Sequence, residues 1–540
     1  MSISVEVSLL SGKTATVQAG LDETVETLAQ RAQIALGVGK GRLLDSSGVV
    51  LDGSAVTKKA RVQNGDSLTL QVNRVQVQFA AYSFAAILGD GSVVTWGAGV
   101  GRDSNARQGR PKNVQQIQAR SGAFAAILDD GSVMTWGDAD FGGDSSAVQG
   151  QLRNVQQIQA NGGAFAAVLA DGSVVTWGHA GSGGDSSAVQ GQLKNVLQIQ
   201  ASGRAFAAIL DDGSVVTWGL ADFGGDSSAA QGQLKNVQQI QASARAFAAI
   251  LVSGAVVTWG DAGFGGDSSA VQAQLKNVQQ IQASSAAFAA ILADGSVVTW
   301  GLAYSGGDSR AVQGQLKNVL QIQASSRAFA AILDDGSVVA WGDAGYGGDS
   351  SASQGELKHV QQIQASEGAF AAILGDGSVV TWGHAVFGGD SSAVQRQLKN
   401  VQQVQACSDA FAAILGDGSV VTWGVADTGG DSSAVQGQLK NVQQIQATGG
   451  AFAAVLADGS VVTWGDALRG GDSSVVLAQL TVRICDFGWS AEVQAERALL
   501  TTCGTPHYWP PEIFEGECQV TPKRNYNGDH RSCWRPWAFK

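Results

Sequence analysis

The sequence predicts a mainly β protein, in which a small α+β domain precedes a propeller-like array of ten short β-blades. The first observation behind this prediction is a tryptophan that recurs every 40 or 41 residues at ten positions. The second is that each tryptophan stands twelve residues after a Phe that opens the run F-A-A-[IV]-L. The third is periodic glycine, 72 of 540 residues, which marks turns rather than disorder. A fixed period of this length is typical of propellers, solenoids and arrays. The tryptophans are Trp96, Trp136, Trp177, Trp218, Trp259, Trp300, Trp341, Trp382, Trp423 and Trp464.

Residues 196–236 represent one repeat. Residues 196–201 and 205–210 are apolar enough for two strands, and Asp211-Asp212-Gly213 is a tight-turn signal. Residues 214–218 are rich in β-branched side chains and predict the return strand. A blade of three or four such strands is too small to bury its own Phe and Trp. Neighbouring repeats must therefore cover these rings, and burial of each ring is worth roughly 1.5–3 kcal/mol.

The segment before each first strand permits a second interpretation. Val189, Leu193, Val196 and Ile199 follow helical spacing, and Asp185 or Ser186 would cap such a helix. Gly191 and the many Gln and β-branched residues argue against it. The all-β array is the preferred prediction, and a strand-plus-helix solenoid is the alternative.

Two recurring polar features have a structural and a functional interpretation. The Gly-Gly-Asp-Ser-Ser loops lack the nonapeptide period of calcium-binding β-rolls, so we expect turns in which Asp or Ser binds its own backbone. The lysines of the L-K-N sequence predict a solvated rim in preference to an anion site. They are Lys194, Lys235, Lys276, Lys317, Lys358, Lys399 and Lys440.

The run V-x-x-I-x-A…F-A-A-I-L-x-D-G-S-V-V-T-W-G resembles the repeat of the regulator of chromosome condensation family, over residues 75–474. The resemblance implies a ring of four-stranded blades, seven in that family, with roles in nucleotide exchange, chromatin binding, ultraviolet sensing and ubiquitin-ligase scaffolds. The unit here is shorter than the family's repeat and there are ten copies, which leaves a closed ring and an open spiral both open. The copies are nearly identical, which indicates recent duplication.

Residues 1–73 have a different pattern. Residues 3–9 and 14–18 flank Ser11-Gly12-Lys13 and predict a hairpin, and Asp22 is expected to cap a helix over 23–36. Further strands are expected at 42–44, 49–51 and 67–72. The predicted buried face of the helix consists of Val25, Leu28, Ala32 and Ala35.

This ββαββ order, with its S-G-K-T turn and R-L-L strand, resembles ubiquitin, which implies a β-grasp domain. The chain continues through Asn73-Arg74 into the first repeat, so conjugation to targets is not expected. The resemblance implies partner binding through a three-part apolar patch. Leu10 and Leu44 match two of its positions, and the third falls at Gln71, which is polar. Ordinary surface or half-buried positions are an equal alternative for Leu10 and Leu44.

A third resemblance begins after the repeats. Residues 484–490 (I-C-D-F-G-W-S) and 501–512 (T-T-C-G-T-P-H-Y-W-P-P-E) resemble the activation segment of an Aurora-like protein kinase. The resemblance implies Asp486 as the magnesium ligand and Thr501 or Thr502 as the phosphorylation site. A V-A-I-K-like lysine and an H-R-D catalytic loop are missing from the sequence, and phosphoryl transfer needs both. We therefore interpret residues 475–517 as a kinase fragment without enzymatic activity and 518–540 as a disordered tail.

Composition restricts the partners. The net charge is −12 and no Lys/Arg run exceeds two residues, so direct nucleic-acid binding is not expected. No stretch approaches the roughly 18–20 apolar residues of a membrane span. An odd count of five cysteines, with Cys407 alone inside the repeats, predicts a cytoplasmic or nuclear protein. The C-terminal cysteines (Cys485, Cys503, Cys518 and Cys533) are too widely spaced for zinc, even with His507 and His530, so neither metal nor cofactor is expected.

These observations predict a non-enzymatic protein-interaction scaffold that binds proteins through repeat loops and the ubiquitin-like domain. Ubiquitin-pathway components are the expected partners, since propellers related to these repeats occur in large HECT-type ligases. Two alternatives remain. One is a kinase-related protein whose truncated catalytic fragment binds ATP, and the other is a guanine-nucleotide exchange factor.

Overall fold

A computed structural model describes residues 2–9, 13–36, 41–72, 75–89, 91–97 and 113–476. It is mainly β, as predicted: one four-stranded sheet is followed by ten three-stranded sheets. In this part of the chain, no helix combines the length and apolar character that a membrane crossing requires.

The N-terminal sheet contains β1 (Ser2–Ser8), β2 (Thr14–Gly20), β3 (Gly41–Leu44) and β4 (Ser67–Val72) in the order β2-β1-β4-β3. β1 pairs antiparallel with β2 and parallel with β4, so the first and last strands form the centre of the sheet. The strand predicted at 49–51 is wrong. Asp45 Oδ1 accepts hydrogen bonds from the Ser47 and Val49 N–H groups, which turns the chain and leaves one isolated bridge between Leu44 and Val50.

The single α-helix of the described residues, α1 (Val25–Leu36), begins later than the sequence predicted. Thr24 Oγ1 accepts a hydrogen bond from the Thr27 N–H at 3.3 Å, so Thr24 is the capping residue and the prediction of Asp22 is wrong. The physical reason lies in Glu23. Its carboxylate accepts the Gly20 N–H at 2.9 Å and pairs with Arg31 at 2.8 Å, which holds the preceding residues in a turn.

The apolar face of α1 packs on the sheet. Val25, Leu28 and Ala32 are buried as predicted, together with Leu36. Ala35 is exposed, contrary to prediction, because the buried face of the helix continues from Ala32 to Leu36, four residues later, rather than to Ala35.

The ten repeat sheets have the same three-stranded, antiparallel order. Their strands are β5 (Gln76–Phe79), β6 (Ser83–Ile87), β7 (Val93–Gly97), β8 (Val114–Arg120), β9 (Ala123–Leu128), β10 (Val133–Gly137), β11 (Val155–Ala160), β12 (Ala164–Leu169), β13 (Val174–Gly178), β14 (Val196–Ala201), β15 (Ala205–Leu210), β16 (Val215–Gly219), β17 (Val237–Ala242), β18 (Ala246–Leu251), β19 (Val256–Gly260), β20 (Val278–Ala283), β21 (Ala287–Leu292), β22 (Val297–Gly301), β23 (Val319–Ala324), β24 (Ala328–Leu333), β25 (Val338–Gly342), β26 (Val360–Ala365), β27 (Ala369–Leu374), β28 (Val379–Gly383), β29 (Val401–Ala406), β30 (Ala410–Leu415), β31 (Val420–Gly424), β32 (Val442–Ala447), β33 (Ala451–Leu456) and β34 (Val461–Gly465).

Short 3-10 helices follow the third strands. They are η2 (Ala139–Phe141), η3 (Ala180–Ser182), η4 (Ala221–Phe223), η5 (Ala262–Phe264), η6 (Ala303–Ser305), η7 (Ala344–Tyr346), η8 (Ser351–Ser353), η9 (Ala385–Phe387), η10 (Ala426–Thr428), η11 (Ala467–Arg469) and η12 (Ser474–Val476).

The predicted strands of the representative repeat are confirmed. β14 and β15 have the predicted limits, and β16 begins one residue late because the Ser214 N–H donates to Asp212 Oδ1 and closes the turn. The strand-plus-helix alternative is wrong, since residues 185–195 form turns rather than an α-helix. Gln190 Nε2 donates to the Val174 carbonyl at 2.9 Å and ties this segment to β13.

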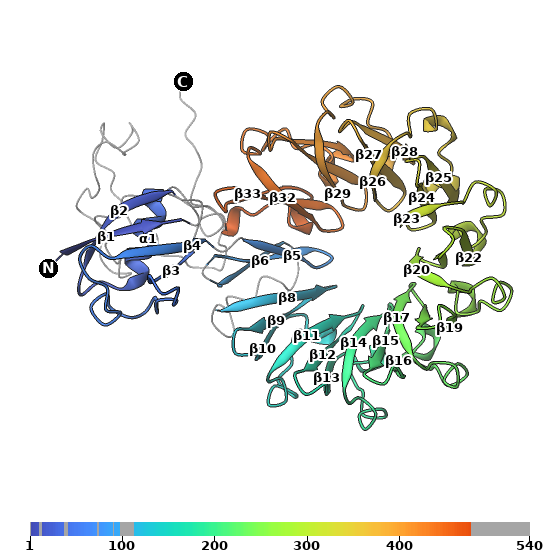
Figure 1. The fold of residues 1–540 in the computed structure, drawn as a ribbon, viewed down its shortest axis with the longest axis horizontal. Helices are drawn as coiled ribbons and strands as arrows, with labels where there is room; N and C mark the ends of the chain where they lie inside the picture. Colours follow the sequence, from blue (N-terminus) through green and yellow to red (C-terminus); the bar gives the residue numbers. More distant parts are fainter. Residues whose placement is uncertain are drawn as a thin grey trace, which may run out of the picture. The chain divides into compact units, whose positions relative to one another are not determined.

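The array is held together by alternating large and small side chains. In repeat four, Phe206 and Trp218 lie on one face of the sheet and pack against Ala164 and Ala166 of repeat three. Phe206 is fully buried and Trp218 is 4% exposed. The opposite face carries Ala205, Ala207 and Ile209, which receive the rings of repeat five. The prediction that neighbours must cover the rings is therefore confirmed. In Figure 1, β8, β11 and β14 lie on the inner side of the array, and β10, β13 and β16, the third strands of the same sheets, lie on the outer side.

A hydrogen bond from the tryptophan indole also links neighbouring repeats. Trp218 Nε1 donates to the Gly183 carbonyl of the preceding repeat at 3.0 Å, and the indole stacks on Phe206 with ring centroids 5.2 Å apart. Gly183 has φ = 91°, and a Cβ there would lie 2.8 Å from Phe206 Cδ2. The same bond forms at eight tryptophans, each time to the glycine 35 positions earlier. Trp96 forms it with Gly470 of the tenth repeat. For Trp136 that position is residue 101, outside the described part.

Contacts between the first and last repeats join the two ends of the array. Trp96 Nε1 donates to the Gly470 carbonyl at 3.0 Å, and this bond is of the same kind as those that link consecutive repeats from the second to the tenth. Val77 and Trp96 of the first repeat share a core with Ala451 and Val461 of the tenth. The sequence alone did not decide between a ring and a spiral.

Eight of the ten repeats, two to four and six to ten, contain two aspartate turns, and repeat five has Ser253 in place of the first aspartate. Asp212 Oδ1 accepts the Ser214 N–H at 2.8 Å across the tight turn, and Asp226 Oδ1 accepts the Ser228 N–H at 2.9 Å in the Gly-Gly-Asp-Ser-Ser loop. The predicted Asp-to-backbone turn is thus confirmed. Hydrogen bonds from the Ser214 side chain and backbone lower the pKa of Asp212, and those from the Ser228 backbone and side chain lower the pKa of Asp226.

We expect Gly183→Ala to destabilise the array by about 2–4 kcal/mol, because it places a Cβ at positive φ and against the Phe206 ring. The urea-unfolding midpoint, followed by tryptophan fluorescence, measures this loss. Gly191→Ala in the same repeat is the matched control, since a Cβ there meets no atom within 4 Å. Equal shifts for the two variants would contradict the proposed packing.

Acid should destabilise the array through the aspartate turns. Their folded pKa values lie below the ordinary value of about 3.9, so the unfolded chain takes up protons first as the pH falls. Their stabilisation is complete above about pH 5, where the unfolded carboxyls are ionised as well, and it is lost as the pH falls through the folded pKa values. The thermal midpoint should therefore fall progressively as the pH is lowered from about 5.

Replacement of several turn aspartates by Asn, starting with Asp212→Asn, is the control for this pH dependence. Asn keeps an acceptor for the Ser214 N–H and removes the titration, so the slope of midpoint against pH should flatten. An unchanged or rising midpoint on acidification of the wild-type chain would refute this assignment.

Candidate interaction surface on the repeats

Each three-stranded sheet has two ends. In repeat four, one end contains residues 202–204, which link β14 to β15, and residues 220–223, which follow β16. These two segments touch, because Ser202 Oγ donates to the Phe223 carbonyl at 2.7 Å and the Leu220 N–H donates to the Arg204 carbonyl at 3.0 Å. We call this the corner end. The opposite end contains the Asp-Gly turn and the L-K-N lead-in, and we call it the turn end.

The corner ends of neighbouring repeats are bonded side by side. The Gly162 N–H donates to the Gly203 carbonyl at 3.0 Å, and the Gly203 N–H donates to the Ala244 carbonyl at 2.9 Å. The same backbone bond continues in 41-residue steps as far as the Ser408 carbonyl. This backbone bond joins the corner ends of repeats three to nine, and Ser121 Oγ of repeat two donates to the Gly162 carbonyl at 2.9 Å. We call the corner ends of repeats two to ten together the corner surface. It comprises residues 120–122, 138–141, 161–163, 179–182, 202–204, 220–223, 243–245, 261–264, 284–286, 302–305, 325–327, 343–346, 366–368, 384–387, 407–409, 425–428, 448–450 and 466–469.

Arginines on the corner surface lie between aromatic rings of neighbouring repeats. The Arg245 guanidinium lies 4.8 Å from the Phe223 centroid and 4.9 Å from the Phe264 centroid. Its Nη1 is 3.8 Å from Asp261 Oδ2, and its side chain remains 43% exposed. Such stacking is worth about 0.5–1 kcal/mol at exposed sites. Arg245 thus braces two repeats while its N–H edge stays accessible.

A second stack of the same type lies in repeats six and seven. The Arg327 guanidinium is 4.5 Å from the Tyr346 centroid and 5.6 Å from the Tyr304 centroid, and it approaches Asp343 at 3.9 Å. Large apolar or aromatic side chains are also exposed on this surface. They are Phe141, Leu220, Tyr304, Val386 and Leu468.

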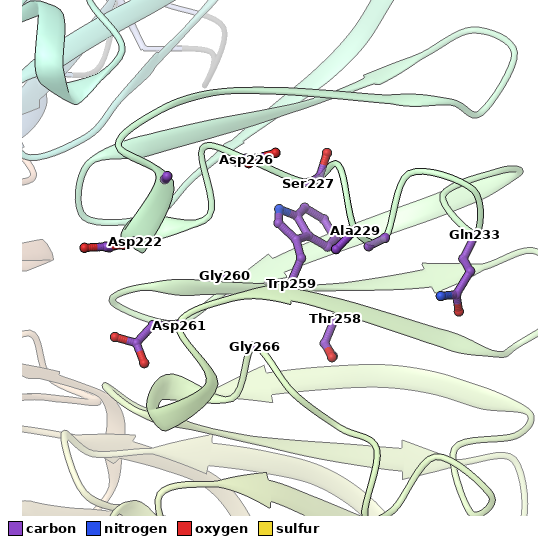
Figure 2. A pocket seen from close by; sticks show the side chains of 12 residues that line it. Asp222, Asp226, Ser227, Ala229, Gln233, Thr258, Trp259, Gly260, Asp261 and Gly266 are labelled. Atoms are coloured by element: carbon purple, nitrogen blue, oxygen red, sulfur yellow. The ribbon is translucent and has the colours of Figure 1, made fainter.

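A groove of about 410 Å³ runs along the junction of repeats four and five, from Asp222 and Asp261 at the corner end towards Gln233. Asp222 and Asp226 line it from repeat four and Asp261 from repeat five. Figure 2 shows Trp259 between the two loops, with Asp222 and Asp261 towards one end of the groove. Ala221, Ala229 and Ala230 supply the apolar part of its wall.

The same groove recurs between repeats nine and ten, where it measures about 670 Å³ and is lined by Asp427, Asp431 and Asp466. Hydrogen bonds from the Ser433 backbone and side chain lower the pKa of Asp431, as those from Ser228 lower the pKa of Asp226. Both carboxylates are therefore charged at neutral pH. No group of three His, Cys, Asp or Glu side chains in the described residues has the geometry of a metal site.

The residues that the sequence nominated lie elsewhere. Leu44 is half-buried in β3 and pairs with Thr69, and the exposed Gln71 lies opposite Arg42 in the same ladder. The alternation of a strand therefore places Leu44 and Gln71 on one face of the N-terminal sheet. Leu10, Asp486, Thr501 and Thr502 lie outside the described residues. The rim lysines, such as Lys194, are exposed at the turn end.

Sequence reasoning named repeat loops as binding elements but did not separate the corner end from the turn end. The signal that separates them was present. The residues after each T-W-G differ from repeat to repeat, whereas the Asp-Gly-Ser turn and the L-K-N lead-in hardly change.

No known protein family and no curated protein matches this sequence. Solved structures do match, among them RCC1 and related β-propeller proteins. Yeast RCC1 (Prp20), in its complex with Kap60, is 17% identical, with a TM-score of 0.29 over 50% of this chain and 70% of that one. The ectodomain of the Physcomitrella patens receptor kinase CR4 is 15% identical, with a TM-score of 0.29 over 50% of this chain and 73% of that one. The computationally designed protein Ika8 is 13% identical, with a TM-score of 0.27 over 58% of this chain and 96% of that one. The likeness concerns the fold alone.

Proposed function

We propose that this protein is a non-enzymatic interaction scaffold with two binding modules. The repeats bind one protein partner through the corner surface, and the ubiquitin-like N-terminal segment recruits another, a component of the ubiquitin pathway. The observation that carries the proposal is the backbone bonding of one corner end to the next, which makes a continuous surface from many separate loops.

The energetics of the repeats support a binding role. The Phe and Trp rings, the small alanines and the indole bond are all used in packing between repeats. The loops at the corner end are held in place by that packing, so little loop ordering has to occur when a partner binds. Exposed aromatic and arginine side chains on such a rigid surface are the residue types that dominate protein interfaces.

The N-terminal module supports the second half of the proposal. Its sheet has a parallel pair of first and last strands with α1 packed across one face. Leu44 and Gln71 lie on the opposite face, at two of the three positions that a ubiquitin-like patch would use. The polar Gln71 makes this patch weaker than a fully apolar one, so we expect modest affinity.

The two modules can be tested in the full-length chain. We expect Leu44→Ala to reduce capture of ubiquitin-pathway proteins from a cell extract at least about five-fold, since part of the apolar contact is lost. It should leave other captured proteins unchanged. The triple substitution L220H/D222G/F223S, which gives repeat four the loop sequence of repeat three, should have the converse effect. Quantitative mass spectrometry of the captured proteins provides the measurement.

Ile34→Ala is the control for Leu44→Ala. Ile34 is a similarly sized apolar residue, 44% exposed, but it lies on α1 rather than on the exposed face of the sheet. The scaffold proposal fails if neither variant changes the set of captured proteins. The link to the ubiquitin pathway fails if Leu44→Ala and Ile34→Ala give the same result.

A further inference from the structure

The ten repeats are nearly identical, so the positions at which they differ are informative. At the corner end, the first residue after T-W-G or A-W-G is Asp, His, Leu or Val in repeats two to ten. Two residues later the position holds Asp, Gly, Tyr, Val or Leu, and the next holds Phe, Ser, Tyr, Thr or Arg. In the segment that links the first strand to the second, the last residue (Arg204 in repeat four) is Gly, Arg, Ala or Asp. Differences in charge, size and aromatic character are therefore concentrated at one end of each sheet.

Exposure alone does not explain this concentration. The turn-end lysines are exposed and form no ion pair within the described residues, yet Lys occupies seven of the eight described lead-ins and Arg153 the other. An unpaired surface lysine contributes little to stability, so packing does not preserve it. Copies of the same age should then have changed as often at the turn end as at the corner end. They have changed mainly at the corner end.

We propose that the corner surface is a recognition surface, diversified repeat by repeat, whose partner is a basic protein segment rich in arginine or lysine. This inference rests on the proposed scaffold function and specifies the chemistry of the partner that binds the repeats.

The negative charge of the corner surface predicts a positively charged partner. The corner surface holds nine carboxylates against five arginines, and the whole chain carries a net charge of −12. Three of the arginines already face an aspartate of their own repeat. The carboxylates are Asp138, Asp140, Asp222, Asp261, Asp343, Glu367, Asp409, Asp427 and Asp466, and the arginines are Arg120, Arg204, Arg245, Arg327 and Arg469.

The same surface shows how it accommodates a guanidinium group. Arg245 lies between two aromatic rings with its N–H edge towards Asp261, so the chain's own arginine occupies an aromatic and carboxylate site. A partner arginine would find similar chemistry in the neighbouring groove. Asp222, Asp226 and Asp261 offer acceptors there, and Ala229 and Ala230 offer apolar contact to the side-chain stem.

The corner surface is also free of lysine of its own. All seven L-K-N lysines lie at the turn end, together with the tight-turn aspartates. A basic segment that approaches the corner surface therefore meets carboxylates, aromatic rings and a few paired arginines. The turn end holds eleven aspartates against seven lysines and Arg153, so its net charge is similar. The corner surface differs from it in having aromatic rings and no lysine, which favours a basic partner there.

The test uses the full-length chain and a fluorescein-labelled (Arg-Gly-Ser)4 peptide as the basic probe, with (Glu-Gly-Ser)4 as the acidic counterpart. Fluorescence anisotropy should show saturable binding of the arginine peptide only. The double substitution D222N/D427N, which removes one carboxylate from each acidic groove, should weaken this binding about five-fold. L220H/D222G/F223S should weaken it as well, and its loop sequence is one that already folds in repeat three.

The matched control is D211N/D334N, which makes the same change in net charge at the turn end. Asp211 and Asp334 precede the turn-forming aspartates, so the turns keep their hydrogen bonds. Unchanged binding by this control supports the inference. The inference is overturned if the control weakens binding as much as D222N/D427N, if the acidic peptide binds equally well, or if the arginine peptide does not saturate. These results would not decide the scaffold function, which the capture experiment with Leu44→Ala and the repeat-four loop variant tests independently.

Discussion

The hydrogen bond from the tryptophan indole of one repeat to a glycine carbonyl of the neighbouring repeat, described for nine of the ten tryptophans, is the constraint on which the rest of the array depends. It needs three things at once: an indole at the end of the third strand, a Phe ring beneath it, and a glycine at positive φ in the neighbouring loop. A side chain at that glycine would meet the Phe ring. Each repeat therefore carries both halves of an interface, and neither half is satisfied inside one repeat.

This division explains why the repeat is so uniform in some places and so variable in others. Ala205 and Ala207 must stay small because the rings of the next repeat pack on them, and a larger residue would overpack a fully buried site. The corner loops have no such restriction beyond their glycine. Leu220, His179 and Asp261 occupy equivalent positions, and all three precede the same 3-10 turn. The interface thus fixes the backbone of the loop and leaves its side chains available for recognition.

The repeat architecture was predictable because its signals are local and recur ten times. The strand limits of repeat four followed from apolar runs and from the Asp-Gly turn, and the structure confirms them within one residue.

The errors in the N-terminal segment arose where a hydrogen bond between a side chain and the backbone sets the local conformation. Thr24 rather than Asp22 caps α1 because Glu23 is engaged by Gly20 and Arg31, a contact that spacing along the chain does not reveal. The acidic groove was also hidden, because its carboxylates come from two repeats and meet only after the sheets stack.

The turn end and the corner end of each sheet carry different residue types because different hydrogen bonds hold their backbones in place. At the turn end, Asp, Gly and Ser are required by a backbone that must reverse direction in a few residues, and the lead-in Asn adopts positive φ beside the turn glycine. Residues used in this way cannot be exchanged for binding residues without loss of the turn. At the corner end, backbone bonds between repeats and a few side-chain bonds, such as that from Ser202 Oγ to the Phe223 carbonyl, hold the loops, and several of the other side chains vary from repeat to repeat. A chain that evolves by copying this unit can therefore change its partner most readily at the corner end, and most of the positions at which the copies differ lie there.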